Sequence, residues 1–208
     1  MLTSQIHGSV GSLEWGVAAR PYPGETSSGD LWLVKDFPDG VLVAVVDVLG
    51  HGEEAAAAAR KAVAVLKQYA HEPLSSLVQE CHRALLGTRG AVMSLASFSL
   101  SASTVTWLGI GNVEGVLLFA DPDARPRRTS LVTQGGIVGG DLPKGRPWVV
   151  PLARGDTLMF ATDGVRSGFA EGLTSRDSAQ QLADRILAKH AKGTDDALVL
   201  VVRYLGSG

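Results

Sequence analysis

The sequence lacks several features that would assign it to a class at once. It contains one cysteine, Cys81, among 208 residues, which excludes an internal disulfide and fits a reducing compartment. No apolar run approaches the roughly 20 residues of a membrane-spanning helix, and the N-terminus has no basic patch followed by an apolar stretch. We therefore expect a cytoplasmic protein without membrane contact, in which Cys81 is a buried structural thiol.

An excess of charge of one sign is missing too. The chain has 19 Lys and Arg against 21 Asp and Glu, and its basic residues are scattered rather than gathered in a stripe. Nucleic-acid-binding faces usually need such a stripe, so we expect no nucleic-acid partner. Internal repeats and low-complexity linkers are also absent. The sequence predicts a single, monomeric domain over residues 1–208, with the polar residues 1–12 as a loose N-terminal arm.

The strongest local pattern that is present is a hairpin with acidic ends. Two β-prone runs, 31–36 and 41–46, flank the turn sequence Phe-Pro-Asp-Gly at 37–40. A symmetric hairpin about this turn places Asp30 and Asp47 opposite each other, or one residue off opposite, about 4.5–5.5 Å apart at Cβ. Carboxylates this close repel each other unless a cation lies between them, and oxygen ligands select hard divalent cations such as Mg²⁺ or Mn²⁺.

A glycine-rich turn follows this hairpin. Gly50 and Gly52 permit backbone conformations closed to other residues and allow a ligand to approach the chain closely. Glu53 and Glu54 then open an alanine-rich helix. A plain strand-to-helix turn with acidic residues at the helix N-terminus explains the same pattern, so this segment alone leaves a ligand site and an ordinary turn both open.

The remaining pattern predicts strands, two helices, more strands, a helix and a closing strand. Helices are expected at 53–70, 74–86 and 175–191, where apolar residues recur at helical spacing. Further strands are expected at 13–19, 92–100, 104–110, 115–120, 127–133, 156–162 and 197–204. This order predicts an α+β fold, in which two antiparallel sheets form the core and helices cover them.

Aspartates recur at the ends of the apolar β-prone runs. They are Asp30, Asp47, Asp163 and Asp195. An aspartate at a strand end usually serves a turn or a cap, and that explanation is open for each of them separately. If the strand ends converge, the carboxylates form an oxygen-rich pocket for two divalent cations, the arrangement that activates water and clamps phosphoryl oxygens during hydrolysis.

The motifs that contain these aspartates follow one another in a characteristic order. They are Ser28-Gly29-Asp30, Asp47-Val48-Leu49-Gly50-His51-Gly52, Ala161-Thr162-Asp163-Gly164-Val165 and Asp195-Asp196. This set resembles the metal-dependent (PPM-type) serine/threonine protein phosphatases, in the bacterial branch typified by the sporulation stage-two E phosphatase. The short chain, Gly109-Ile110-Gly111-Asn112 and the glycine-rich loop 135–140 are most similar to the stressosome feedback phosphatases of general stress signalling. The resemblance implies a four-layer α-β-β-α sandwich, with two mainly antiparallel sheets flanked by helix pairs.

The same resemblance implies a metal site and a mechanism. Asp47 would bridge two Mn²⁺ or Mg²⁺ ions, Asp163 and Asp195 would complete the first site, and Asp30 and the backbone carbonyl of Val48 would complete the second. These residues would act through a metal-bound water that attacks phosphorus. The neighbouring Asp196 would instead hydrogen-bond nearby backbone, because adjacent side chains of an extended segment point to opposite faces.

Two further residues have open roles. His51 either protonates the departing serine oxygen, which suits its pKa range, or is a loop histidine that hydrogen-bonds a carboxylate. Arg20 either meets an anionic substrate or is an ordinary surface residue before a proline.

The expected function is hydrolysis of phosphoserine or phosphothreonine on a signalling partner, with stressosome scaffold proteins as the expected substrates. Three alternatives stay open: a phosphatase of a phosphorylated anti-sigma-factor antagonist, a hydrolase of small phosphate esters, and a catalytically weak binding module of the same fold.

Overall fold

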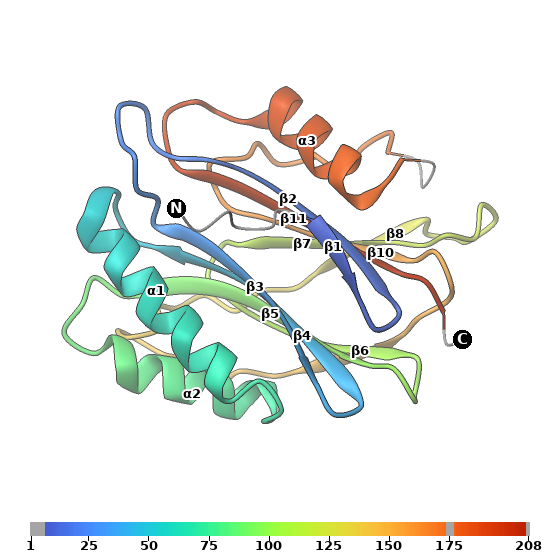
Figure 1. Ribbon diagram of the computed structural model, residues 1–208, viewed down its shortest axis with the longest axis horizontal. Helices are drawn as coiled ribbons and strands as arrows, with labels where there is room; N and C mark the ends of the chain where they lie inside the picture. The colour runs from blue at the N-terminus through green and yellow to red at the C-terminus, as the bar shows by residue number, and fades with distance from the viewer. Residues whose placement is uncertain (1–6, 174–176, 207–208) are drawn as a thin grey trace.

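The computed structural model describes residues 7–173 and 177–206. Its strands are β1 (His7–Val10), β2 (Leu13–Arg20), β3 (Asp30–Phe37), β4 (Gly40–Val48), β5 (Ala91–Ser99), β6 (Thr104–Ile110), β7 (Glu114–Leu118), β8 (Arg128–Leu131), β9 (Trp148–Pro151), β10 (Thr157–Ala161) and β11 (Ala197–Tyr204). They form a six-stranded sheet of order β1-β2-β11-β10-β7-β8 and a five-stranded sheet of order β3-β4-β5-β6-β9. All pairings are antiparallel, and the two sheets stack face to face (Figure 1).

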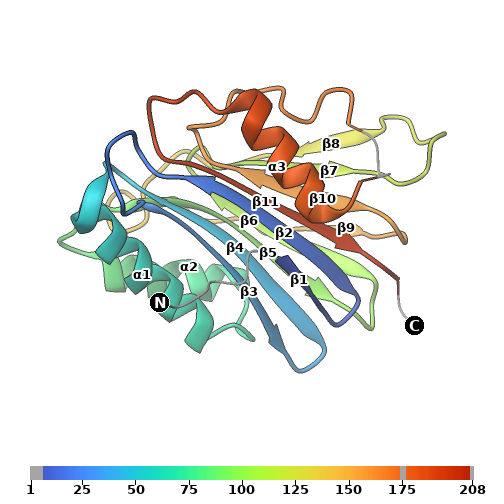
Figure 2. The same ribbon diagram turned by 45° about the horizontal axis from the view of Figure 1, so that its top comes forward.

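Helices cover the outer faces of this sandwich. α1 (Gly52–Gln68) and α2 (Leu74–Leu85) pack on the five-stranded sheet, and α3 (Ala179–His190) packs on the six-stranded one (Figures 1 and 2). The predicted α+β class and the α-β-β-α layers are confirmed. One detail differs, because in the described part of the chain the second helix layer consists of α3 alone rather than a pair.

The central hairpin shows how the sequence determines the register. In β4, Val41, Val43 and Val45 pack between the sheets, while the residues that alternate with them face α1 and α2. Both faces of this strand are therefore buried, which explains its uninterrupted apolar run. The turn at 37–40 closes the β3–β4 pair so that Asp30 lies directly opposite Asp47, as predicted.

Two short edge strands were not predicted. The expected loose arm 1–12 is wrong over residues 7–10, which form β1 and pair with β2, whereas residues 1–6 lie outside the described part. β9 was missed as well. Both strands contain only four residues and are largely exposed. β1 carries no apolar run, whereas β9 has three apolar residues but ends in proline, which is tolerated because the strand lies at a sheet edge.

The third predicted helix, 175–191, begins later than expected. Ser178 accepts a hydrogen bond from the backbone N–H of Gln181, and the Gln181 side chain bonds back to the Ser178 N–H, so α3 starts with a capping box at Ala179. Residues 174–176 lie outside the described part. The other predicted bounds agree with the structure to within two residues. Cys81 is fully buried, as expected, and no described helix is long and apolar enough to cross a membrane.

Candidate metal centre

The strand-end aspartates converge on one cleft. Asp30 and Asp47 come from β3 and β4 of one sheet, and Asp163 and Asp195 flank β10 and β11 of the other. All four line a cavity of about 600 Å³ at one end of the sandwich. The structure therefore brings together every aspartate that the sequence analysis selected. Val48 and His51 line the same cleft.

The two facing carboxylates carry negative charge that no protein cation offsets. Asp30 is 4% exposed and Asp47 is half-buried. Burial, together with repulsion from the neighbouring aspartates, raises the pKa of Asp30 to about 7 and that of Asp47 to about 9. Among the described residues that line the cleft, none is Lys or Arg. A cation between the carboxylates would therefore favour their ionised forms.

Thr162 fixes the position of Asp30. Its hydroxyl donates to Asp30 Oδ2 at 2.7 Å and accepts from the backbone N–H of Leu198 at 2.9 Å. The Asp30 bond lowers the pKa of that carboxyl and so opposes the effect of burial. The sequence analysis did not assign a role to Thr162, although the residue stands directly before Asp163 in the quoted motif.

Asp195 and Asp196 have different partners. The Asp196 carboxylate is almost fully buried and accepts from two backbone N–H groups, that of Tyr22 at 2.7 Å and that of Gly29 at 2.8 Å. Asp195 is exposed to the cleft, and its Oδ1 accepts from the Asp196 N–H at 2.9 Å. Asp196 thus ties both ends of the loop 22–29 to the start of β11. Both aspartates line the cleft, but only the Asp196 carboxylate accepts from two backbone N–H groups of that loop, which leaves Asp195 as the carboxylate freer to bind a cation.

Two motif residues beside the aspartates act through close contacts. Asn112 Nδ2 donates to Asp163 Oδ2 at 3.1 Å, so the Gly-Ile-Gly-Asn segment reaches the site. A Cβ on Gly164 would overlap the carbonyl oxygen of Asp196, so this position requires glycine. The first contact was missed by the sequence analysis, which used the segment only for the resemblance.

His51 forms part of the cleft wall. Its ring stacks on Tyr22, with centroids 4.1 Å apart and planes at 9°, and its Nδ1 lies 3.4 Å from Glu25 Oε1. Glu25 is therefore the carboxylate partner expected if His51 is an ordinary loop histidine. The His51 ring also lines the cleft, so the catalytic alternative stays open. Arg20 is exposed at the end of β2 and does not line the cleft, so nothing places it at the anion site.

The donor set suits hard divalent cations. Within the described residues, no three His, Cys, Asp or Glu side chains form a ready-made metal cage. The oxygen ligands around the cleft nevertheless match what Mg²⁺ and Mn²⁺ select, and the raised pKa values show that the ionised carboxylates lack a positive partner here. The donor set fits divalent cations, while their number and the assignment of each ligand remain predictions.

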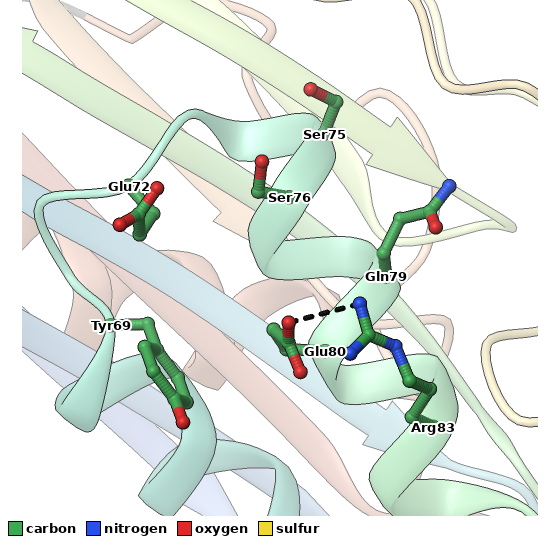
Figure 3. A pocket seen from close by; sticks show the side chains of 7 residues that line it. All are labelled: Tyr69, Glu72, Ser75, Ser76, Gln79, Glu80 and Arg83. Atoms are coloured by element: carbon green, nitrogen blue, oxygen red, sulfur yellow. Dashed lines mark ion pairs between the residues drawn. The ribbon is translucent and has the colours of Figure 1, made fainter.

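A second hollow on the surface lacks these properties. It encloses about 450 Å³ where α1 ends and α2 begins, and Figure 3 shows its side chains. Glu80 is paired with Arg83 at 3.0 Å there, so its charge is already offset. No set of carboxylates converges in this hollow, and the strand-end cleft is the candidate site.

Comparisons with known proteins agree with this geometry. The family model described as Stage II sporulation protein E (SpoIIE) matches residues 38–205. The phosphoserine phosphatase RsbX of Bacillus subtilis (strain 168) is 23% identical over 164 residues, which cover 76% of this chain and 80% of that protein.

Two solved structures support the fold. One comes from work that describes the bacterial stressosome as a modular system adapted to control secondary messenger signalling. It superposes with a TM-score of 0.82 at 31% identity, and the match covers 92% of this chain and 99% of that one. The other, RsbX in complex with magnesium, superposes with a TM-score of 0.83 at 19% identity and covers 95% and 98%. The predicted two-sheet architecture is confirmed by both.

Proposed function

Because this chain belongs to the stage II sporulation protein E family, we propose that it is a metal-dependent protein serine/threonine phosphatase whose substrates are phosphorylated stressosome components. The observation that carries the proposal is the convergence of Asp30, Asp47, Asp163 and Asp195 on one cleft without a basic residue. The phosphoserine phosphatase activity of RsbX, a relative of this chain, supports the same reaction.

In this proposal each aspartate has a defined task. Asp47 lies between two divalent cations, Asp163 and Asp195 hold one of them, and Asp30 with the Val48 carbonyl holds the other. When bound, the cations supply an activated water and stabilise the charge on the phosphoryl oxygens. Thr162 and Asn112 orient two of these carboxylates through the hydrogen bonds described above.

Proton transfer to the departing serine or threonine oxygen falls to His51. Its Nδ1 is directed to Glu25, which leaves Nε2 as the atom that exchanges a proton with the substrate. Tyr22 holds the imidazole plane by stacking, and Asp196 holds Tyr22 through its backbone N–H. The loop 22–29 is therefore a support for the histidine.

The cleft favours a phosphorylated side chain over a free nucleotide. Tyr22 is the one Phe, Tyr or Trp among its described lining residues, and a face of its ring is already covered by His51. A stacked base would have to displace that contact. The stressosome context comes from the structure that is 31% identical to this chain.

The test is phosphate release with Mn²⁺ and with excess chelator. We expect rapid metal-dependent release from phosphorylated stressosome scaffold proteins and slow release from free nucleotides. Faster release from a phosphorylated anti-sigma-factor antagonist than from the scaffold proteins would identify the antagonist as the substrate. No release from either protein or from p-nitrophenyl phosphate, at saturating Mn²⁺, would show a binding module instead of an enzyme.

A further inference from the structure

Another recess, which we call the edge groove, lies between β8 and β9. Each of these strands is the last of its sheet (Figure 2). The groove has a volume of about 400 Å³, and Trp107, Phe119, Leu131, Trp148 and Val150 are among its lining residues. It is therefore an apolar opening into the layer between the sheets.

The inner face of the five-stranded sheet is uncovered at this groove. Trp148 lies opposite Trp107 in the β6–β9 register, so the two side chains share that face. Trp107 is 2% exposed, whereas Trp148 is 64% exposed. Val132, at the end of β8, is 71% exposed. The facing sheet ends before it covers Trp148, and an apolar surface is left in contact with solvent.

Trp107, which lines the groove, also carries a buried hydrogen-bond donor. The indole Nε1 of Trp107 is buried and has no acceptor among the described residues. Buried tryptophan N–H groups normally have a partner, because an unpaired buried donor is costly.

The strands that form the groove belong to basic segments. Residues 125–132 and 144–154 contain Arg125, Arg127, Arg128, Lys144, Arg146 and Arg154 and no acidic residue, in a chain with a net charge of −2. Arg128 pairs with Glu171 at 3.6 Å, and Arg125 donates to backbone carbonyls. The other four have no ion pair within the described residues, so the segments favour an acidic occupant.

The groove is connected to the metal cleft by a short piece of chain. Val132 lines the groove and Gly135 lines the cleft. Three residues span at most about 11 Å when fully extended. A protein segment held in the groove therefore keeps its neighbouring residues close to the cleft.

We propose that the edge groove docks an extended, acidic segment of the phosphoprotein substrate. The segment adds as a strand to the free edge of β9 and places an apolar side chain against Trp148. Free sheet edges bind extended peptides in this way, through main-chain bonds and pockets for alternate side chains. This inference rests on the proposed phosphatase function, and it assigns substrate selection to a surface outside the cleft.

The experiment compares two substrates on the same variants. The substrates are p-nitrophenyl phosphate, which is too small to reach the groove, and the phosphoprotein that the full chain dephosphorylates fastest. The groove variants are Trp148→Ala and the double charge reversal Arg127→Glu/Arg146→Glu. Matched controls are Leu86→Ala, an equally exposed apolar residue on α2's C-terminal side, and Lys67→Glu/Lys189→Glu on exposed helix positions.

We expect the groove variants to raise KM for the phosphoprotein about 10-fold, as the loss of an anchor residue does at an interface. Their kcat, and all constants for p-nitrophenyl phosphate, should equal those of the parent chain, and the control variants should keep the parent's kcat and KM for both substrates.

Unchanged KM for the phosphoprotein in both groove variants would overturn the inference while leaving the phosphatase function intact. A parent chain that sediments as a dimer and becomes monomeric with Trp148→Ala would also overturn it, because a second copy would then occupy the groove. A parent chain inactive on both substrates would refute the proposed function itself.

Discussion

The cleft and the edge groove lie between the same two sheets and differ in what they leave uncompensated. The cleft gathers carboxylates without a Lys or Arg beside them, whereas the groove exposes the apolar side chains of Trp148 and Val132. The first imbalance suits small hard cations, and the second suits a protein segment. The comparison teaches that one fold can separate chemistry from recognition: strand ends concentrate charge, and an incompletely covered sheet edge supplies binding surface.

The largest effect is expected when a carboxylate of the cleft is neutralised. We expect Asp47→Asn to abolish turnover of p-nitrophenyl phosphate and to leave the fold intact, because the amide has the shape of the carboxylate without its charge. The metal-free variant should melt at a higher temperature than the parent, since burial and neighbouring aspartates both oppose an ionised Asp47. Steady-state kinetics and thermal melting measure the two effects.

The matched control is Asp39→Asn in the β3–β4 turn. Asp39 has a φ of 65°, a conformation that asparagine adopts readily, and it is exposed. This variant should behave like the parent in both measurements. Near-normal activity in Asp47→Asn would reduce Asp47 to an ordinary strand-end residue.

How much of this was predictable from sequence differs between the two regions. The facing of Asp30 and Asp47 followed from the turn and from the two-residue period of strands, which together determine the register. The meeting of that pair with Asp163 and Asp195 required the stacking of two sheets and came from the family resemblance, which the SpoIIE match confirms.

Other contacts had no sequence signal. Asp196 and the Tyr22 backbone are 174 residues apart, and no local pattern joins a carboxylate to a distant N–H group. The groove was invisible for another reason. β9 is short, exposed and ends in proline, so it resembles a loop, and the exposure of Trp148 depends on where the facing sheet ends.

A second test sharpens the contrast between neighbouring residues within the cleft. We expect Asp195→Ala to lose one cation and nearly all turnover, because this carboxylate is directed at the cleft. Asp196→Ala should keep both cations and lose about 10–100-fold in activity, the usual cost of removing a group that orients a ligand. The Asp196→Ala substitution removes the acceptor of the Tyr22 backbone N–H and so releases the loop that carries Tyr22. Calorimetric counting of Mn²⁺ in the two variants decides the question, and the reverse outcome would shift the predicted ligand by one residue.

A smaller effect is expected from Thr162→Val, which preserves shape and removes the hydroxyl. The Asp30 carboxylate loses a donor that lowers its pKa, so its proton should compete more strongly with Mn²⁺ and weaken metal affinity by about 10-fold. The Leu198 N–H loses its hydroxyl partner as well, which should cost about 1–3 kcal/mol of folding stability. Thr133→Val, at a partly exposed position outside the cleft, is the control. Equal Mn²⁺ affinity in parent and Thr162→Val would show that the hydroxyl does not orient Asp30.

The pH dependence of metal-free stability separates the two regions without touching activity. Asp30 and Asp47 have pKa values raised from 3.8 to about 7 and about 9 in the folded protein. Their protonated forms are favoured by folding, so this stabilisation is complete below pH 4 and is lost as the pH rises through 7 and 9. The free energy of unfolding in excess chelator should therefore fall over this window, by on the order of 1.4 kcal/mol for each unit of pKa difference that is traversed. Asp47→Asn should flatten the fall between pH 7 and 9, whereas Trp148→Ala should keep it, because the groove side chain carries no titrating group. Denaturant titrations at a series of pH values measure the slopes, and an equal slope in the parent and Asp47→Asn would show that the cleft stores no uncompensated charge.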